Sequence, residues 1–179
     1  MHPLTDRELD ILRLAQLRDP LALTMLVQSY GESLYHQILK MVQRAPDADD
    51  VLQETLIKAW NGLPGFRGAS SLSTWLHRIA IHEAYSFLRK EQLRRKRLQW
   101  LGLARRTPQE SVENKNPAYL LMQGLSILPD RQRLVFVLRY FDQMEYKAMA
   151  ALTGLSEGAL KASYHHAHRK MEVWLLARA

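Results

Sequence analysis

Polar side chains with rings and cations recur at helical spacing near the middle of the chain. Arg78, His82, Tyr85 and Arg89 follow one another at steps of four, three and four residues, which places them on one face of a helix. Aromatic rings stack on unpaired bases and cations follow phosphates, so this face suits single-stranded nucleic acid. The alternative is that Tyr85 and His82 only cover the edge of a core, and these residues alone leave both interpretations open.

The positive charge of the chain is concentrated next to that face. The 179 residues include 25 Lys and Arg against 18 Asp and Glu, which gives a formal net charge of +7. Residues 89–106 hold eight basic side chains and one acidic side chain, so the net charge of this stretch equals the net charge of the whole chain. A concentrated basic run favours a polyanionic partner, because each neutralised phosphate releases counterions. A solvated helix end without a partner is the alternative.

A second candidate for nucleic-acid binding is a helix-turn-helix over residues 145–172. Gly154 permits the positive φ of a tight turn, Leu155 follows as a core residue, and Ser156 can cap the next helix. The outer face of that second helix would meet a major groove. It presents Gly158, Lys161, Ala162, His165, His166 and Arg169. An ordinary helical hairpin is the alternative.

Enzymatic and metal-binding interpretations have little support. The chain has no cysteine, which excludes disulfides, thiolate metal sites and a Cys nucleophile. It has no Gly-rich phosphate loop and no Gly-flanked nucleophilic serine. His165 and His168 could share an ion, but no carboxylate or thiolate partner is evident. We therefore expect no enzyme activity, no metal and no cofactor.

The composition indicates a globular, cytoplasmic protein. Apolar residues make up 47% of the chain, which is typical of a protein that folds around a core. No apolar run approaches the about 18 residues that a membrane span needs. The first residues include acidic side chains, unlike a signal peptide.

The periodicity is helical nearly everywhere, and we expect an all-α fold. The pattern predicts helices over 6–17 and 21–43, a Pro46 break followed by acids able to cap a helix, and a helix carrying Val51 to Trp60. A loop is expected over 62–71 and a helix from about Ser73. Further helices are expected from Pro117, from Asp130, over about 145–152 and from Glu157 to Leu176.

The periodicity fades between about residue 102 and 117, where prolines and polar side chains leave little to bury. This segment predicts a flexible linker between two helical lobes. The expected division is a first lobe over 1–97, a linker over 98–117 and a second lobe over 118–179.

Both lobes carry motifs of a known family. Residues 47–90 contain the acidic cluster with Gln53-Glu54-Thr55, then Ala59-Trp60, Phe66-Arg67-Gly68 and Thr74-Trp75-Leu76. This stretch resembles region 2 of the extracytoplasmic-function (ECF) sigma factors, the bacterial promoter-recognition subunits of RNA polymerase in the sigma-70 family. Residues 128–171, which contain the helix-turn-helix, resemble region 4 of the same family. The two stretches occur in the family's order across the expected linker.

The resemblance implies roles for the first lobe. Region 2 binds the largest catalytic subunit of core RNA polymerase, a role that would fall to Asp49, Asp50, Gln53 and Glu54. Region 2 also melts the −10 element and captures an extruded base. That role would fall to the loop residues Phe66, Arg67, Ser70 and Ser71 and to the helix face of Arg78, His82, Tyr85 and Arg89. Flipping a base costs a few kcal/mol, which stacking at about 1–3 kcal/mol per base can offset.

The resemblance also implies partners and a role for the second lobe. Region 4 recognises duplex DNA at the −35 element, which would fall to Lys161, Ala162, His165, His166 and Arg169. The implied partners are core RNA polymerase and promoter DNA. Many relatives are held inactive by an anti-sigma factor, and the sequence leaves open whether this chain is.

Several positions depart from the family's usual pattern. The family usually has Asn at His82 and an acid at Ser86, and arginines at Ser163, His166 and His168. Losing Arg at 166 removes a bidentate donor suited to guanine, so we predict an atypical −35 preference or weaker duplex binding. Histidine also gains a charge near neutral pH, which predicts stronger DNA binding on acidification.

Two other functions compete with that of a sigma factor. A polymerase-independent helix-turn-helix regulator would keep the second lobe but would have no use for the acidic face. A helical interaction protein without a nucleic-acid role would tolerate neutralisation of Arg94 to Arg97.

Overall fold

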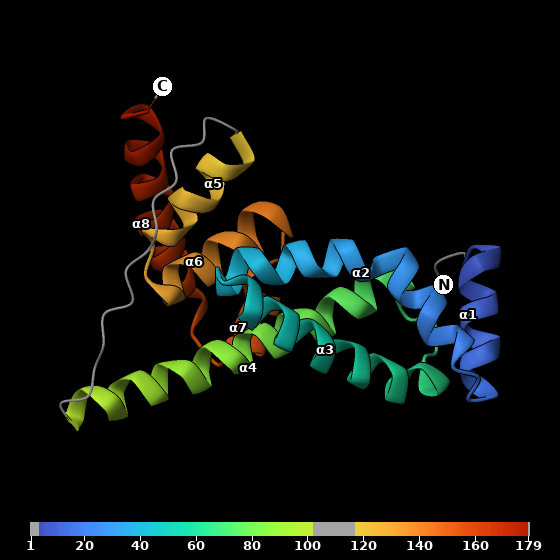
Figure 1. The fold of residues 1–179 in the computed structure, drawn as a ribbon. Coiled ribbons are helices and arrows are strands. Elements are labelled where there is room, and N and C mark those ends of the chain that lie inside the picture. Colours follow the sequence, from blue (N-terminus) through green and yellow to red (C-terminus); the bar gives the residue numbers. More distant parts are fainter. Residues whose placement is uncertain (1–3, 102–116, 179) are drawn as a thin grey trace. The chain divides into compact units, whose positions relative to one another are not determined.

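The computed structural model describes residues 4–101 and 117–178, and every regular element within them is helical. This confirms the all-α fold class. The chain divides into two compact units, Met1–Ser86 and Phe87–Ala179, which are described separately (Figure 1). The expected linker lies largely outside the described residues, so the lobe boundaries stay a prediction.

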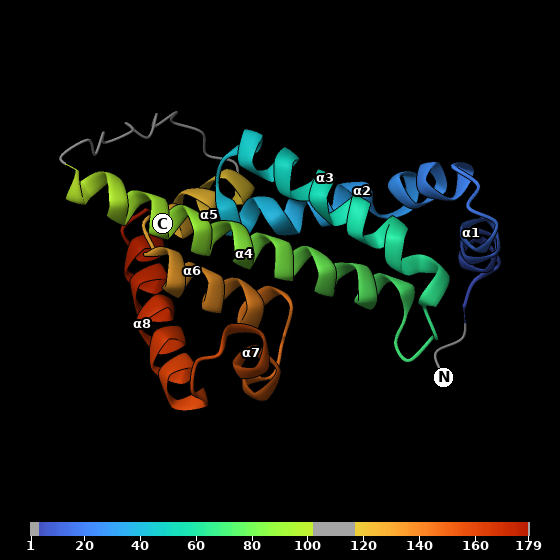
Figure 2. The same cartoon turned by 90° about the horizontal axis from the view of Figure 1, so that it is seen from below.

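The first unit packs its helices around one core. It contains α1 (Asp6–Gln16), α2 (Leu21–Val42), α3 (Ala45–Gly62), the short 3₁₀ helix η1 (Leu63–Gly65) and the first part of α4 (Leu72–Trp100). Helices α2 and α3 lie side by side in both views (Figures 1 and 2). Fully buried large side chains include Ile11, Leu26, Leu34, Ile38, Met41, Leu63, Leu72 and Leu76.

Local sequence signals explain where the first helices begin and end. Thr5 and Glu8 form a reciprocal capping box at the start of α1. Helix α2 ends at Gln43, whose φ of 73° is left-handed. Helix α3 begins at Ala45 with Pro46 in its first turn, so the proline starts the helix and does not separate it from the acids. This position is favourable because the first N–H groups of a helix lack intrahelical partners.

The second unit holds the helix-turn-helix. Besides the end of α4 it contains α5 (Pro117–Ser126), α6 (Asp130–Phe136), the π-helical turn η2 (Val137–Phe141), α7 (Tyr146–Thr153) and α8 (Glu157–Leu176). Helix α8 packs against α6, α7 and α5. Its core face presents Leu160, Ala167 and Met171, all buried as the helical spacing predicts.

The turn of the helix-turn-helix has the predicted geometry. Gly154 ends α7 with a φ of 71°, and its N–H donates to the carbonyl of Ala150. Ser156 then caps α8 by accepting a hydrogen bond from the N–H of Ala159 at 3.2 Å. A glycine and a capping serine two residues later therefore set the angle between the two helices.

Candidate nucleic-acid interface

The polar face of α4 is formed as the spacing predicts. Arg78, His82 and Arg89 are exposed and Tyr85 is partly buried. Polar contacts to two neighbouring helices hold the first half of α4 in place. Lys58 Nζ of α3 lies 2.7 Å from Glu83 Oε1, and Gln37 Oε1 of α2 lies 2.6 Å from His77 Nδ1. These contacts fix the rotation of α4 and thereby the direction of its exposed face.

The loop before α4 is supported by an aromatic pair. The rings of Phe66 and Trp75 lie 5.4 Å apart at an interplanar angle of 57°. A Cβ atom at Gly62 would lie 2.9 Å from Trp75 Cζ2, so the indole occupies space that only glycine leaves free. The N-terminus of α4 is held by Ser71, whose Oγ accepts a hydrogen bond from the N–H of Thr74 at 3.1 Å.

The four loop residues assigned to the −10 element therefore have different environments. Arg67 is exposed, whereas Phe66, Ser70 and Ser71 are partly buried. The structure brings this loop and the polar face together along one helix, because the loop leads directly into α4.

The acidic residues of α3 form one exposed surface. Asp49, Asp50, Gln53 and Glu54 are all exposed, and their spacing places them on a continuous arc of the helix. The opposite side of α3 buries Ala48, Val51, Thr55 and Ala59. Thr55 is accommodated in the core because its hydroxyl donates to the carbonyl of Val51 at 2.7 Å. The arc is thus free to contact a partner without disturbing the core.

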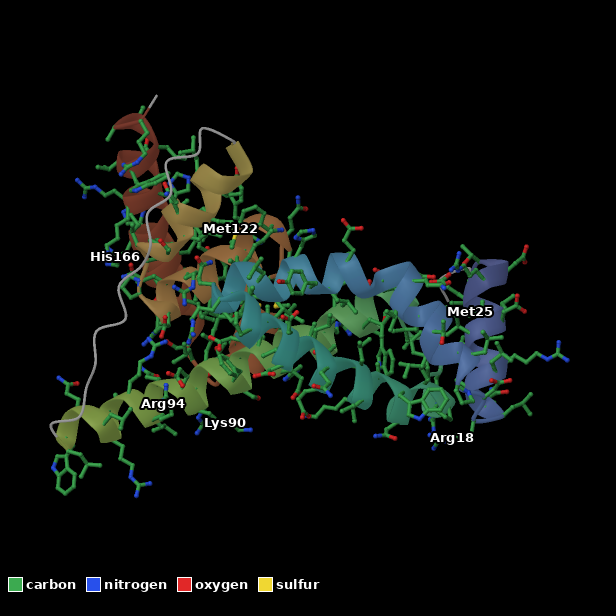
Figure 3. All side chains as sticks on the ribbon, in the orientation of Figure 1. Arg18, Met25, Lys90, Arg94, Met122 and His166 are labelled. Atoms are coloured by element: carbon green, nitrogen blue, oxygen red, sulfur yellow. The ribbon has the colours of Figure 1, made fainter. Side chains whose placement is uncertain are left out.

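Helix α8 exposes the predicted DNA-binding residues. All five are exposed: Lys161, Ala162, His165, His166 and Arg169. Figure 3 shows His166 on this helix. Lys161 and Arg139 both lie against the ring of Tyr146, at 5.6 Å and 5.2 Å from its centroid. This cation–π group gathers two positive charges beside the start of the helix.

An aromatic stack supports α8 from beneath. The ring of Phe136 stacks on Tyr140 at 5.1 Å and on Tyr164 at 5.9 Å. Burial raises the pKa of Tyr164, so its hydroxyl stays neutral and the stack stays apolar. The stack was not predictable from helical spacing, because Tyr140 belongs to a π-helical turn whose register differs from that of an α-helix.

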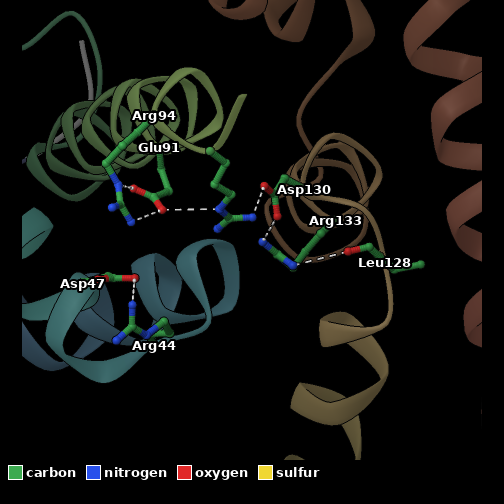
Figure 4. A network of polar contacts seen from close by, with 8 residues as sticks. Arg44, Asp47, Glu91, Arg94, Leu128, Asp130 and Arg133 are labelled. Atoms are coloured by element: carbon green, nitrogen blue, oxygen red, sulfur yellow. Dashed lines mark hydrogen bonds and ion pairs between the residues drawn. The ribbon is translucent and has the colours of Figure 1, made fainter. Parts of the chain in front are cut away.

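A buried arginine anchors the start of α6. Arg133 Nη2 lies 2.7 Å from Asp130 Oδ1, and its Nη1 donates to the carbonyl of Leu128 at 3.3 Å (Figure 4). Burial lowers the pKa of Arg133, and the charge of Asp130 opposes that shift. Arg133 was not among the residues predicted from the sequence, although an Asp three positions before an Arg at a helix start is a recognisable signal.

Two kinds of site are not found within residues 4–101 and 117–178. No group of three His, Asp or Glu side chains there could hold a metal ion. None of the helices in that part of the chain combines the length and apolar character that crossing a bilayer requires.

Comparison with known proteins identifies both units. Residues 26–94 match the model of sigma-70 region 2, and residues 119–171 match that of sigma-70 region 4. The sigma factor YlaC of Bacillus subtilis is 28% identical over 156 residues, which cover 82% of this chain and 88% of that protein. The ECF sigma-E factor of Escherichia coli K12 is 27% identical over 184 residues, with 88% of each chain covered.

Solved structures show the same fold. The sigma factor RpoE of Bartonella quintana, solved with the anti-sigma factor NepR, matches with a TM-score of 0.60 at 22% identity and covers 83% of this chain and 93% of its own. CnrH, solved with the cytosolic domain of CnrY, matches with a TM-score of 0.57 at 24% identity and covers 97% of this chain and all of its own.

The paired matches, in order and across one chain, define the class of protein. This chain belongs to the sigma-70 family, within its extracytoplasmic-function group. It is a sigma factor that directs transcription initiation, and a polymerase-independent regulator is not favoured. Sigma factors are regulatory, non-catalytic proteins, which fits the expectation that this chain is no enzyme.

Proposed function

We propose that this chain binds core RNA polymerase and positions it at promoters through two DNA contacts. The observation that carries the proposal is that both matched regions occur in one chain and that each exposes the surface its role requires. Bond formation then belongs to the core enzyme, in the cytoplasm of a bacterium. The first lobe (1–97) acts at the −10 element and the second lobe (118–179) at the −35 element, with residues 98–117 linking them.

The acidic arc of α3 is the proposed contact with core polymerase. Asp49, Asp50, Gln53 and Glu54 are exposed, so a basic partner surface could pair with the carboxylates without rearrangement of the helix. Charge complementarity of this kind accelerates association and fixes orientation. An anti-sigma factor that covers this surface would block polymerase binding, and the two structural relatives solved with NepR and CnrY support such a partner.

The −10 contact is divided between the loop and α4. Phe66, Arg67, Ser70 and Ser71 surround the proposed site of the extruded base, next to the Phe66–Trp75 aromatic pair. Arg78, His82, Tyr85 and Arg89 then follow the opened strand along α4. Stacking on Tyr85 and phosphate contacts to the arginines would offset the cost of unpairing.

The −35 contact is the exposed face of α8. Lys161, His165, His166 and Arg169 supply donors to base edges and phosphates, and Ala162 allows close approach to the groove. The face contains the imidazole of His166 where the resemblance to region 4 leads us to expect a guanidinium group, so we propose a −35 preference that differs from that of typical members.

Run-off transcription tests the proposal. Core polymerase without a sigma factor is incubated with fragments of bacterial genomic DNA, with and without this chain. We expect discrete transcripts only when the chain is present. The variant Asp50→Lys with Gln53→Lys should abolish them, whereas Asp10→Lys in α1, also an exposed acid, should not. Transcripts that do not depend on the chain would contradict the proposal.

A further inference from the structure

The proposed −10 face does not account for the whole of α4. The face ends at Arg89 and the region 2 match ends at residue 94, but the helix continues to Trp100. From Arg78 to Trp100 the axis runs about 33 Å at 1.5 Å per residue. The terminal segment, residues 89–100, contains most of the basic side chains of residues 89–106, the stretch whose net charge equals that of the whole chain. We call this segment the α4 tail.

The α4 tail continues the polar face of α4. Lys96 follows Arg89 by seven residues and Trp100 follows Lys96 by four, so both lie on the same side of the helix as Arg78 and Arg89. Arg97 lies at the edge of that side. Trp100 is 85% exposed, so its indole is available to a partner.

The cations of the tail fall into two groups. On one side, Glu91 accepts hydrogen bonds from Arg94 Nε and Nη2, both at 2.7 Å, and from Arg95 Nε at 3.3 Å (Figure 4). The hydrogen bond from Arg94 is the main reason that the pKa of Glu91 is lowered. That carboxylate therefore stays charged and offsets part of the charge on its own side of the helix.

The other group is available to an external anion. Within the described part of the chain, four cations of the tail are exposed and form no ion pair. These are Arg89, Lys90, Lys96 and Arg97. Figure 3 shows Lys90 projecting from this segment. Of the unpaired cations, Arg89 and Lys96 share with Trp100 the side that continues the proposed −10 face. Arg97 lies at the edge of that side, and Lys90 lies about 100° from Arg89 around the helix.

This arrangement fits a nucleic-acid backbone better than a membrane. A helix that lies on a bilayer separates an apolar face from a charged one, whereas here Trp100 shares a side with Lys96 and Arg89. A row of cations matches the regular spacing of phosphates, and the tail from Arg89 to Trp100, about 17 Å long at 1.5 Å per residue, corresponds to about five base pairs at 3.4 Å each. The charge and its arrangement both favour DNA.

The order of the chain indicates which DNA the tail meets. The N-terminal end of α4 follows the loop proposed to capture the extruded base, and its C-terminal end leads into the segment joined to the −35-binding unit. Along the chain, the tail therefore lies between the residues proposed for the −10 element and those proposed for the −35 element. This step rests on the proposed function.

We propose that the α4 tail binds the backbone of the duplex spacer between the −10 and −35 elements. Lys96 and Arg97 contact phosphates of the duplex, upstream of the −10 face that ends at Arg89, and Trp100 packs against the sugar–phosphate surface at the upstream end. This contact is independent of spacer sequence and strengthens the grip of the first lobe on double-stranded DNA.

The test measures binding of the reconstituted holoenzyme to two probes. Both derive from a promoter identified by run-off transcription, one with the full spacer duplex and one whose duplex ends just upstream of the −10 element. On the full probe, Lys96→Gln with Arg97→Gln should lower the slope of log affinity against log salt by about two, since each phosphate contact contributes about 0.9. It should weaken binding about tenfold and leave the short probe unchanged. The control is Arg94→Gln with Arg95→Gln, which removes the same charge from the side that Glu91 occupies, together with the ion pair of Arg95 Nη1 with Asp130 Oδ2 at 3.2 Å. It should lower the slope by less than half as much.

A second measurement locates the contact directly. Because the chain has no cysteine, Gln99→Cys supplies a unique thiol for an iron chelate that cleaves nearby DNA. We expect cleavage in the spacer. Trp100→Ala should weaken binding to the full probe several-fold, and Trp100→Phe should restore most of it.

Three results would overturn the inference. The first is that the two double variants have equal salt slopes. The second is that the iron chelate does not cleave the spacer. The third is that Lys96→Gln with Arg97→Gln weakens binding to anionic phosphatidylglycerol vesicles and leaves binding to DNA unchanged. If the holoenzyme forms and initiates transcription but one of these three results is found, the proposed spacer contact fails and the proposed function stands. If no holoenzyme forms, the proposed function itself fails.

Discussion

At position 166 the exposed face of α8 carries an imidazole, whereas the resemblance to region 4 leads us to expect a guanidinium group there. Arginine is planar, always charged and able to donate two parallel hydrogen bonds to guanine, whereas histidine is shorter and only partly charged near neutral pH. The side chain is exposed, so an arginine fits there without repacking.

We therefore predict that His166→Arg strengthens binding of this protein to duplex −35 DNA about tenfold, within the about 1–3 kcal/mol expected of a bidentate contact. Fluorescence anisotropy of the reconstituted holoenzyme on labelled duplex measures the change. Gln16→Arg in α1 adds the same charge at another exposed position and controls for net charge alone. Equal gains from both variants would show that position 166 does not contact DNA.

Tyr30 joins α2 to α1 through its hydroxyl, which donates to Glu8 Oε1 at 2.9 Å. Burial and then the hydrogen bond to Glu8 raise the pKa of Tyr30 to about 12. Because the folded pKa lies above the usual value of 10.0, this tyrosine stabilises the fold fully below about pH 10. That contribution is lost as the pH rises through about 12, because the unfolded chain ionises first.

Tyr30→Phe should consequently lower the free energy of unfolding by about 1 kcal/mol near neutral pH, the usual net worth of one hydrogen bond. It should also reduce the decline in stability above about pH 10. Urea denaturation monitored by circular dichroism at several alkaline pH values measures both effects. An unchanged alkaline decline in the variant would assign that decline to other groups.

At the scale of elements, the junction between α3 and α4 depends on the absence of a side chain at Gly62. A Cβ atom there would lie 2.9 Å from Trp75, so the indole and the loop carrying Phe66 would have to shift. Gly62→Ala should destabilise the protein by about 1–3 kcal/mol, the usual cost of overpacking. It should also impair promoter opening more than binding of duplex −35 DNA.

Gly65→Ala provides the matched control, because nothing lies within 4 Å of a Cβ atom at that position. Thermal denaturation and permanganate footprinting of the −10 element measure the two effects. Equal behaviour of the two alanine variants would show that Trp75 adjusts freely and does not position the loop.

Most elements were predictable because their signals are local. Apolar spacing and the capping serine at 156 predicted α8 with its observed bounds, Glu157–Leu176, and Gly154 predicted the turn before it. The exposure of the acidic arc and of the α8 face followed from the same periodicity. These features require only the chain within a few turns of each residue.

Features that depend on contacts across the fold were not predictable. The π-helical turn η2 changes the register after Val137, and the ion pair between Lys58 and Glu83 joins residues 25 positions apart. No local pattern marks either one. Likewise, the sequence predicted that Pro46 separates two helices, whereas Pro46 occupies the first turn of α3. A proline is favourable both between helices and at a helix start, so the local sequence does not distinguish the two.

At the scale of the whole molecule, the proposed mechanism requires two modest contacts on one chain. Linking them makes the second binding event intramolecular, so the combined affinity can exceed that of either by orders of magnitude. The acidic arc of α3 then couples both contacts to the polymerase that performs the chemistry. Binding to core polymerase is thus the central claim, because neither DNA contact leads to transcription without it.

Co-elution with core RNA polymerase on size-exclusion chromatography tests that claim most directly. We predict that the purified chain elutes with core enzyme lacking its own sigma factor, in a one-to-one complex. Asp50→Lys with Gln53→Lys should elute separately, and Asp10→Lys should co-elute as the unaltered chain does. Separate elution of the unaltered chain and core polymerase would contradict the account.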